Sequence, residues 1–141
     1  MSSITSPKLK NQVPTMLKNG CIYKFTCAEE CRKEYIGESK RLLKTRIGEH
    51  FQESRVDESA IGEHTSECQY FKNSLNNKLL EIPNSTPAEH NRIRMEHIQN
   101  HFRPMAFNTN NKKRKTIEAL MISLYEPELN EQVVHNKTFL L

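Results

Sequence analysis

The chain has 141 residues, of which 35% are hydrophobic and 27% are charged, and its net charge is +4. This length suits a single domain with a modest core, and 4 glycines with 6 prolines exclude collagen-like and Pro/Gly-rich low-complexity chains. The sequence lacks an apolar run of the roughly 20 residues that span a bilayer, and its first residues do not resemble a secretory signal. We therefore expect a nuclear or cytoplasmic protein, in which free thiols bind metals more often than they form disulfides.

The N-terminal half predicts two strands and a helix. Gly20–Cys27 is short and rich in β-branched and aromatic residues, Glu34–Gly37 has the same character, and the residues between them are few enough for a hairpin. Ser39 can then cap a helix that runs to about His50. Apolar residues at positions i, i+4 and i+8 would form one stripe of this helix: Leu43, Ile47 and Phe51.

The C-terminal half predicts further elements separated by polar segments. We expect a short helix at 57–66 and a strand at 78–83 that ends with a proline. A polar loop at 108–111 then precedes a helix at 113–125, which Pro127 ends. The apolar face of this last helix consists of Ile117, Leu120, Met121 and Leu124.

One more helix is indicated between these segments. Thr86–Glu89 has the pattern of a capping box with proline at the first helical position, which predicts a helix from Pro87 to about Phe102. His97 and His101 lie at i and i+4 on this helix and could bind a metal. Two ligands alone do not close a site, so ordinary surface histidines are the favoured interpretation.

Positive charge is concentrated in residues 32–46 and in the run Lys112–Lys115. Such clusters suit a polyanion such as nucleic acid, because neutralised phosphates release counterions. Solvated surface charge explains the clusters equally well, and the second run is also typical of a nuclear localisation signal. The candidate DNA contacts are Lys40, Arg41, Lys44, Lys112, Lys113, Arg114 and Lys115.

Two tyrosines lie in the predicted hairpin. Because side chains alternate along a strand, Tyr23 and Tyr35 can share one face while Ile22 and Ile36 point to a core on the other. Packing is the default role of such tyrosines.

Polar residues that follow in a characteristic order change this interpretation. The sequence reads G-x-I-Y at Gly20–Tyr23 and Y-I-G at Tyr35–Gly37, followed by an arginine and a histidine on one helical face, a glutamate on a later helix and an asparagine beyond it. This pattern, over roughly residues 20–132, resembles the GIY-YIG endonucleases. The resemblance implies the catalytic residues Tyr23, Tyr35, Arg46, His50, Glu118 and Asn130.

The sequence looks closest to the endonuclease domain of Penelope-like retroelements. In that branch a cysteine pair separates the two tyrosine motifs and a second ligand pair follows the arginine helix. The pairs here are Cys27-x3-Cys31 and His64-x3-Cys68, although a histidine is more usual at the last position. The resemblance implies a DNA partner and, in a longer natural chain, a reverse transcriptase domain. This chain lacks that domain, so we expect an excised domain or a stand-alone relative.

The four ligand candidates also suit tetrahedral zinc by their spacing, because both pairs fall within the ranges of structural zinc sites. The long segment between the pairs excludes a small DNA-reading finger. We expect a structural clip between the hairpin turn and the segment after the arginine helix. Free or buried thiols are the alternative. Cys21 is left out because the other residues complete four-coordination.

The chemistry of phosphodiester hydrolysis gives the catalytic candidates their roles. Glu118 could bind Mg²⁺ or Mn²⁺, and Arg46 could bind phosphate through its bidentate fork. Tyr23 could accept a proton from the attacking water if a cation lowered its pKa from near 10. Tyr35 and His50 would orient water or phosphate, and either could exchange roles with Tyr23.

The expected architecture is therefore an α+β, GIY-YIG-like fold with a short three-stranded antiparallel sheet, flanking helices and a zinc clip. The domain would cover 20–132, with an N-terminal tail at 1–19, an insertion near 83–111 and a C-terminal tail at 133–141. Asn130 would hold a tyrosine or phosphate in place. Two alternatives use the same sequence: an inactive zinc-stabilised DNA-binding domain, and a protein-interaction domain that uses the charged residues at 84–111.

Overall fold

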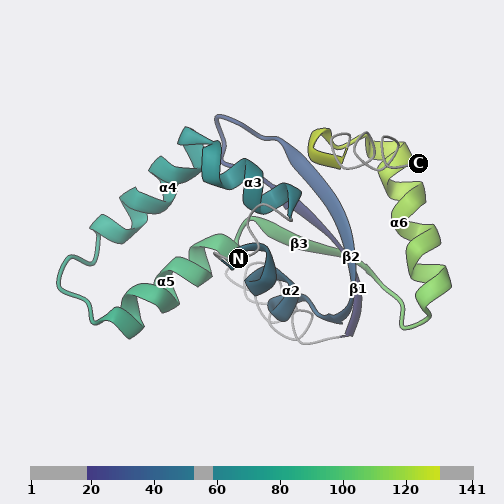
Figure 1. Ribbon diagram of the computed structural model, residues 1–141, viewed down its shortest axis with the longest axis horizontal. Coiled ribbons are helices and arrows are strands. Elements are labelled where there is room, and N and C mark those ends of the chain that lie inside the picture. Colours follow the sequence, from purple (N-terminus) through teal and green to yellow (C-terminus); the bar gives the residue numbers. More distant parts are fainter. Residues whose placement is uncertain (1–18, 53–58, 131–141) are drawn as a thin grey trace, which may run out of the picture.

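The computed structural model describes residues 19–52 and 59–130. The predicted tails, apart from Asn19, which is the first residue of β1, and the first residues of the helix predicted at 57–66 lie outside this part of the chain. Within it, no helix is long and apolar enough to cross a membrane. The elements, in chain order, are β1 (Asn19–Thr26), β2 (Glu34–Leu42), α2 (Leu43–His50), α3 (Ala60–Glu67), α4 (Gln69–Leu80), α5 (Pro87–Gln99), β3 (Phe102–Phe107) and α6 (Asn111–Tyr125) (Figure 1).

The three strands form an antiparallel sheet in the order β2-β1-β3. Tyr23 pairs with Gly37 on β2 and with Pro104 on β3, so β1 is the central strand. The helix α6 lies on one side of the sheet and α2 to α5 lie on the other (Figure 1). The predicted α+β class, with a three-stranded antiparallel sheet flanked by helices, is therefore confirmed.

The main core lies on the sheet face that carries the tyrosines. Alternate residues of β1 pack there against α2, α3, α4 and β3, and the aromatic rings of Phe25 and Phe102 lie 5.1 Å apart between centroids. Ile22 and Ile36 are fully buried, as expected, but they point to the opposite face, which α6 covers. Apolar burial on both faces explains why the strand residues 20–27 read as an almost continuous apolar run.

The predicted helix start at Ser39 is wrong, because β2 continues to Leu42 and α2 begins only at Leu43. Ser39 pairs with Cys21 in the sheet, and its buried hydroxyl accepts a hydrogen bond from the N–H of Arg41. Serine competes well for nearby backbone groups in any local conformation. Pairing with β1 therefore keeps the residues around Ser39 extended, and the local sequence pattern does not contain this information.

The strand predicted at 78–83 is also wrong, because α4 runs through to Leu80. Phe71 and Leu75, at i and i+4, contact the core and stabilise this helix from one side. The third strand is instead β3, which lies inside the range 83–111 that we expected as an insertion. Between them, α5 begins after the cap of Thr86, whose hydroxyl accepts from the N–H of Glu89 as predicted, and it ends at Gln99 rather than near 102.

Candidate metal centre and candidate active site

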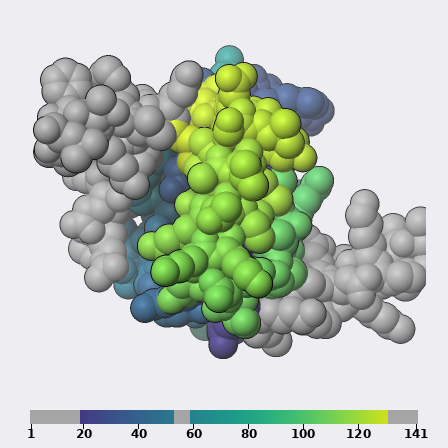
Figure 2. Space-filling model, turned by 90° about the vertical axis from the view of Figure 1, so that its right-hand side faces the viewer, coloured from purple at the N-terminus to yellow at the C-terminus, as the bar shows by residue number. Residues whose placement is uncertain are grey.

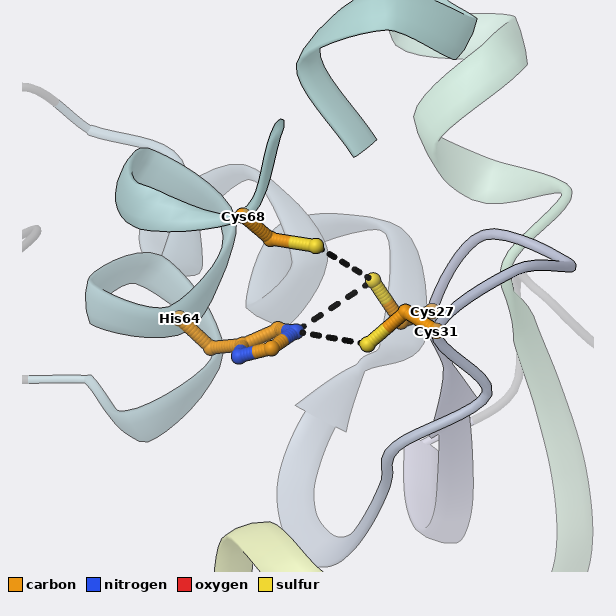
Figure 3. Close-up of side chains that lie close together, drawn as sticks. All are labelled: Cys27, Cys31, His64 and Cys68. Carbon is orange, nitrogen blue, oxygen red and sulfur yellow. Dashed lines mark hydrogen bonds between the residues drawn. The ribbon is translucent and has the colours of Figure 1, made fainter. Parts of the chain in front are cut away.

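Four predicted ligands meet between the hairpin turn and the end of α3. Cys27 and Cys31 come from the β1–β2 turn, and His64 and Cys68 come from the last turn of α3 and the residue after it (Figure 3). Their ligand atoms all lie within 4.8 Å of one another. They form the one such cluster of three or more His, Cys, Asp or Glu residues in the described part of the chain.

The distances between these atoms fit a tetrahedral ion. A zinc centre with bonds of about 2.3 Å to sulfur and about 2.0 Å to nitrogen has edges of roughly 3.8 Å for S···S and 3.5 Å for S···N. The structure has 3.8 Å between the Cys27 and Cys68 sulfurs, and 3.3 Å and 3.4 Å from His64 Nε2 to the sulfurs of Cys27 and Cys31. Four ligands at these separations could hold a zinc ion, with no position left for a substrate.

The electrostatic environment favours two of the ligands in their metal-binding forms. Burial lowers the pKa of His64, which keeps the imidazole neutral. Although burial alone would raise the pKa of Cys68, the backbone of Phe71, the neighbouring thiols of Cys27 and Cys31 and the backbone of Tyr70 lower it. Cys68 is the N-cap of α4, and the N-terminus of a helix stabilises a thiolate.

A second cluster lies along β2, which is an edge strand of the sheet. The side chain of Tyr23 crosses from β1 over Gly37, where an added Cβ would lie 2.6 Å from the phenol oxygen and 2.8 Å from the ring of Tyr35. The two tyrosine rings, which the sequence placed on one face, are 6.5 Å apart between centroids. Gly37 is thus required by the close approach of both phenols to the backbone of β2.

The phenol of Tyr23 is connected to His50 of α2. Its oxygen lies 2.8 Å from His50 Nε2, and the other ring nitrogen, Nδ1, is hydrogen-bonded to the hydroxyl of Ser59. Ser59 is held in turn as the N-cap of α3, where its oxygen accepts from the N–H of Gly62 at 3.1 Å. Both Tyr23 and His50 are buried, and burial lowers the pKa of His50 to about 3, so the imidazole is neutral at neutral pH.

Arg46 of α2 and Glu118 of α6 both influence the two phenols electrostatically. Burial raises the pKa of Tyr23, with further raising by Tyr35 and Glu118, while Arg46 acts in the opposite direction. Burial and then Glu118 raise the pKa of Tyr35, and Arg46 again opposes them. Because these effects require proximity, the phenol, guanidinium and carboxylate groups lie in one region, at the edge of β2 between α2 and α6.

Exposure separates the two tyrosines. Tyr23 is fully buried, whereas Tyr35, Arg46 and Glu118 are half-buried. The sequence suggested Tyr23 as the group that contacts the attacking water. In the structure Tyr35 is better placed for this role, because it is accessible to solvent and Tyr23 is not. Sequence order alone could not distinguish two phenols on one face.

Asn130 has a structural position in this cluster. Its side-chain amide accepts from the N–H of Ile36 at 2.7 Å and donates to the carbonyl of Ile36 at 2.8 Å. It thus satisfies the outer backbone groups of β2 between Tyr35 and Gly37, as a neighbouring strand would. The hydrogen bonds of Asn130 therefore go to the backbone of Ile36, between Tyr35 and Gly37, and not to a tyrosine side chain.

The prediction that Arg114 contacts DNA does not fit the structure. Its side chain is buried, lies 2.6 Å from the carboxylate of Glu38, and also donates to the carbonyl of Asn108 and the side chain of Asn111. Each of its three guanidinium nitrogens donates to a protein group, so the buried side chain fixes α6 to β2 instead of facing DNA. The remaining predicted contacts are exposed: Lys40, Arg41, Lys44, Lys112, Lys113 and Lys115.

Sequence reasoning missed two residues that support the cluster. Ser59 orients His50, but it lies inside the helix predicted at 57–66, so its capping position before α3 was not predicted. Glu49 pairs with Arg46 at 3.2 Å and also with Arg41, which holds both guanidinium groups beside the edge of β2. The i, i+3 spacing of Arg46 and Glu49 is visible in the sequence, but the second partner depends on the turn between β2 and α2.

Comparisons with known proteins do not assign the chain to a family. No protein-family model, no curated protein and no solved structure matches it. The class of the chain is thus defined by its fold and by its two clusters: an α+β domain with a candidate structural metal centre and a polar cluster at one sheet edge.

Proposed function

We propose that the chain is a metal-dependent DNA endonuclease of the GIY-YIG type, similar to the endonuclease domain of Penelope-like retroelements, and that its Cys3His cluster binds structural zinc. One observation carries the proposal. Half-buried Arg46 and Glu118 both act electrostatically on half-buried Tyr35 and on Tyr23, which is buried and hydrogen-bonded to His50. These residues come from distant parts of the sequence.

The chemical groups in the cluster match the needs of phosphodiester hydrolysis. Mg²⁺ binds through one or two carboxylates and keeps several waters for the phosphate to replace, so the single carboxylate of Glu118 suits it. The bound ion would supply charge stabilisation and a more acidic water. Arg46, fixed by Glu49, would hold the phosphate with a rigid fork of donors.

Tyr35 has the access that a group in contact with the attacking water needs, and Tyr23 has the buried position of a group that orients it. His50 is neutral, so Nε2 can accept the proton of Tyr23 when Nδ1 donates to Ser59. In that arrangement the chain from Ser59 to Tyr23 fixes the direction of the Tyr23 hydroxyl beside Tyr35.

Nicking of supercoiled plasmid tests the function. Zinc-loaded protein in chelator-free buffer should nick DNA when Mg²⁺ or Mn²⁺ is added and should not nick without either ion. Glu118→Gln should reduce the rate by at least about 100-fold, since it removes the ligand that holds the charge-stabilising ion. The control Glu81→Gln changes an exposed carboxylate at the end of α4 and should retain full activity.

Two results would lead to the alternatives. Retention of plasmid without nicking under any divalent ion would indicate an inactive DNA-binding domain, and no DNA binding at low salt would indicate a protein-interaction domain. Equal nicking by Glu118→Gln and Glu81→Gln would remove the assigned active site even if the preparation cleaved DNA.

A further inference from the structure

A basic pocket lies next to the candidate active site. It has a volume of about 330 Å³ and lies between the second half of β2, α2 and the first turns of α6. Its lining is strongly cationic, with only one carboxylate, that of Glu38. The lining residues are Glu38, Ser39, Lys40, Arg41, Arg46, Asn111, Arg114 and Lys115.

The positive charge of the pocket is incompletely neutralised within the protein. Glu38 is engaged by buried Arg114, at 2.6 Å, so it does not offset the other cations. Arg41 and Arg46 share a single carboxylate, that of Glu49. Lys40 and Lys115 are exposed and form no ion pair with the described residues. The pocket therefore has the charge of an anion-binding site.

The start of α6 strengthens this conclusion. A helix N-terminus favours acidic residues, because its first N–H groups carry partial positive charge. The first turn of α6 has no acidic residue and begins a run of basic ones. Figure 2 shows this end of α6, in green, beside the blue surface of the β2–α2 segment. An anion in the pocket would neutralise charge from both sides.

The pocket and the candidate active site share residues. Arg46 belongs to both, and on α6 the lining residues Asn111, Arg114 and Lys115 lie on the same helical stripe as Glu118, at spacings of three, four and seven. One helical turn, about 5.4 Å, therefore separates the pocket from the carboxylate assigned to the cation. A strand that placed one phosphate at Arg46 and Glu118 would bring a neighbouring phosphate to the pocket.

We propose that this pocket binds the backbone phosphate adjacent to the one that is cleaved, and so fixes the position of the DNA strand along the edge of β2. The inference rests on the proposed function. It assigns Lys40 and Lys115 as its principal binding residues, because they are exposed cations from two segments that only the fold brings together.

The test compares two double variants with the same change of charge. Lys40→Ala/Lys115→Ala removes the pocket lysines, and Lys72→Ala/Lys78→Ala removes two exposed lysines of α4. Binding of a fluorescent DNA duplex to zinc-loaded protein is measured over a series of salt concentrations, without Mg²⁺ or Mn²⁺. One lost phosphate contact should reduce the slope of log K against log salt by about 0.9 in the pocket variant only.

A second arm uses inorganic phosphate as the probe. Titration with phosphate should shift the amide NMR signals of Arg41 and Lys115 in the wild-type protein and in the α4 control. In the pocket variant, which lacks Lys115, the amide signal of Arg41 should not move. A free-phosphate site without a role in DNA binding would give these shifts with unchanged DNA slopes, which would overturn the proposal.

The outcomes also separate this proposal from the proposed function. If the slope of log K against log salt is the same in the two double variants, the proposed phosphate site is wrong, even if the protein nicks DNA. A selective loss of slope in the pocket variant would support the pocket even if the wild-type protein failed to nick. The folding of each variant is checked by its zinc content and thermal unfolding.

Discussion

At the scale of single residues, Gly37 shows why a small residue is needed beside two tyrosines. The phenols of Tyr23 and Tyr35 both pass within van der Waals distance of the position where a Cβ would stand. A methyl group there meets rigid aromatic rings, one of them fully buried, and they cannot move without disturbing the core.

We predict that Gly37→Ala reduces nicking strongly and lowers the free energy of unfolding by about 1–3 kcal/mol, because it overpacks this contact. The control is Gly48→Ala in α2, where an added Cβ meets nothing within 4 Å. That change should stabilise the helix by up to about 1 kcal/mol and leave nicking intact. Urea unfolding and plasmid nicking measure both effects, and equal behaviour of the two variants would contradict the packing role of Gly37.

His50 gives a prediction about pH. Burial lowers its pKa to about 3 in the folded protein, whereas a histidine in an unfolded chain titrates near 6.5. Below about pH 6.5 the unfolded chain therefore binds a proton that the folded protein does not, so His50 makes folding stability fall as the pH falls from about 6.5 toward 3. The loss approaches about 1.4 kcal/mol per pH unit.

NMR of the imidazole measures this directly in zinc-loaded protein. The ring signals of His50 should stay at their neutral positions from pH 7.5 down to pH 5.5. A midpoint near 6.5 would mean that His50 is hydrated and charged, and the hydrogen-bonded chain from Ser59 to Tyr23 would then have to be abandoned.

At the scale of secondary-structure elements, the Cys3His cluster brings together two parts of the chain that are distant in the sequence. The β1–β2 turn supplies Cys27 and Cys31, and α3 with the start of α4 supplies His64 and Cys68. The helices α4 and α5 each bury one residue, Phe71 and Ile98, and therefore contribute few core contacts of their own. A metal at this point would fix the helical half of the domain.

We predict one zinc ion per chain by native mass spectrometry, and loss of that ion in Cys31→Ser. Removal of the metal should unfold or loosen the domain, with an effect comparable to the whole folding free energy of a small domain, about 5–15 kcal/mol. Cys21→Ala is the matched control, since Cys21 is a buried thiol outside the cluster and should leave zinc content unchanged. Freshly made wild-type protein without zinc would contradict the structural role.

The elements also show how far sequence patterns determine this structure. The existence of the hairpin, α2, α5 and α6 follows from local composition, apolar spacing and prolines, although the predicted cap of α2 at Ser39 is wrong. The third strand, β3, could not be predicted, because it is short, contains Pro104 and gains its stability from pairing with β1. The apolar face predicted for α6 is also largely exposed, with Leu120 and Leu124 at 64% and 76%.

The candidate sites also have some features that the sequence predicts and others that it does not. Spacing was sufficient to identify the four residues that form the Cys3His cluster, since the two members of each pair are four residues apart in the sequence. The contribution of Ser59, the burial of Arg114 and the unequal exposure of the two tyrosines depend on packing between distant segments. These features had no sequence signal beyond the residue types.

At the scale of the whole molecule, the helices on the two faces of the sheet both border β2, which is an edge strand. The helix α2 brings Arg46 from one side and α6 brings Glu118 from the other, while Asn130 covers the outer backbone of β2 at Ile36. The basic pocket continues this edge toward the start of α6. The edge of β2 thereby becomes a single track of positive and polar groups on which a DNA strand could lie.

The most direct measurement uses Mn²⁺ as a paramagnetic probe of zinc-loaded protein. If Tyr23, Tyr35 and Glu118 surround one divalent cation, substoichiometric Mn²⁺ should broaden the ring signals of both tyrosines selectively, and Glu118→Gln should abolish this broadening while Glu81→Gln retains it. Sharp tyrosine signals in a wild-type protein that nicks DNA with Mn²⁺ would contradict the account, because cleavage would then occur at a cation bound elsewhere.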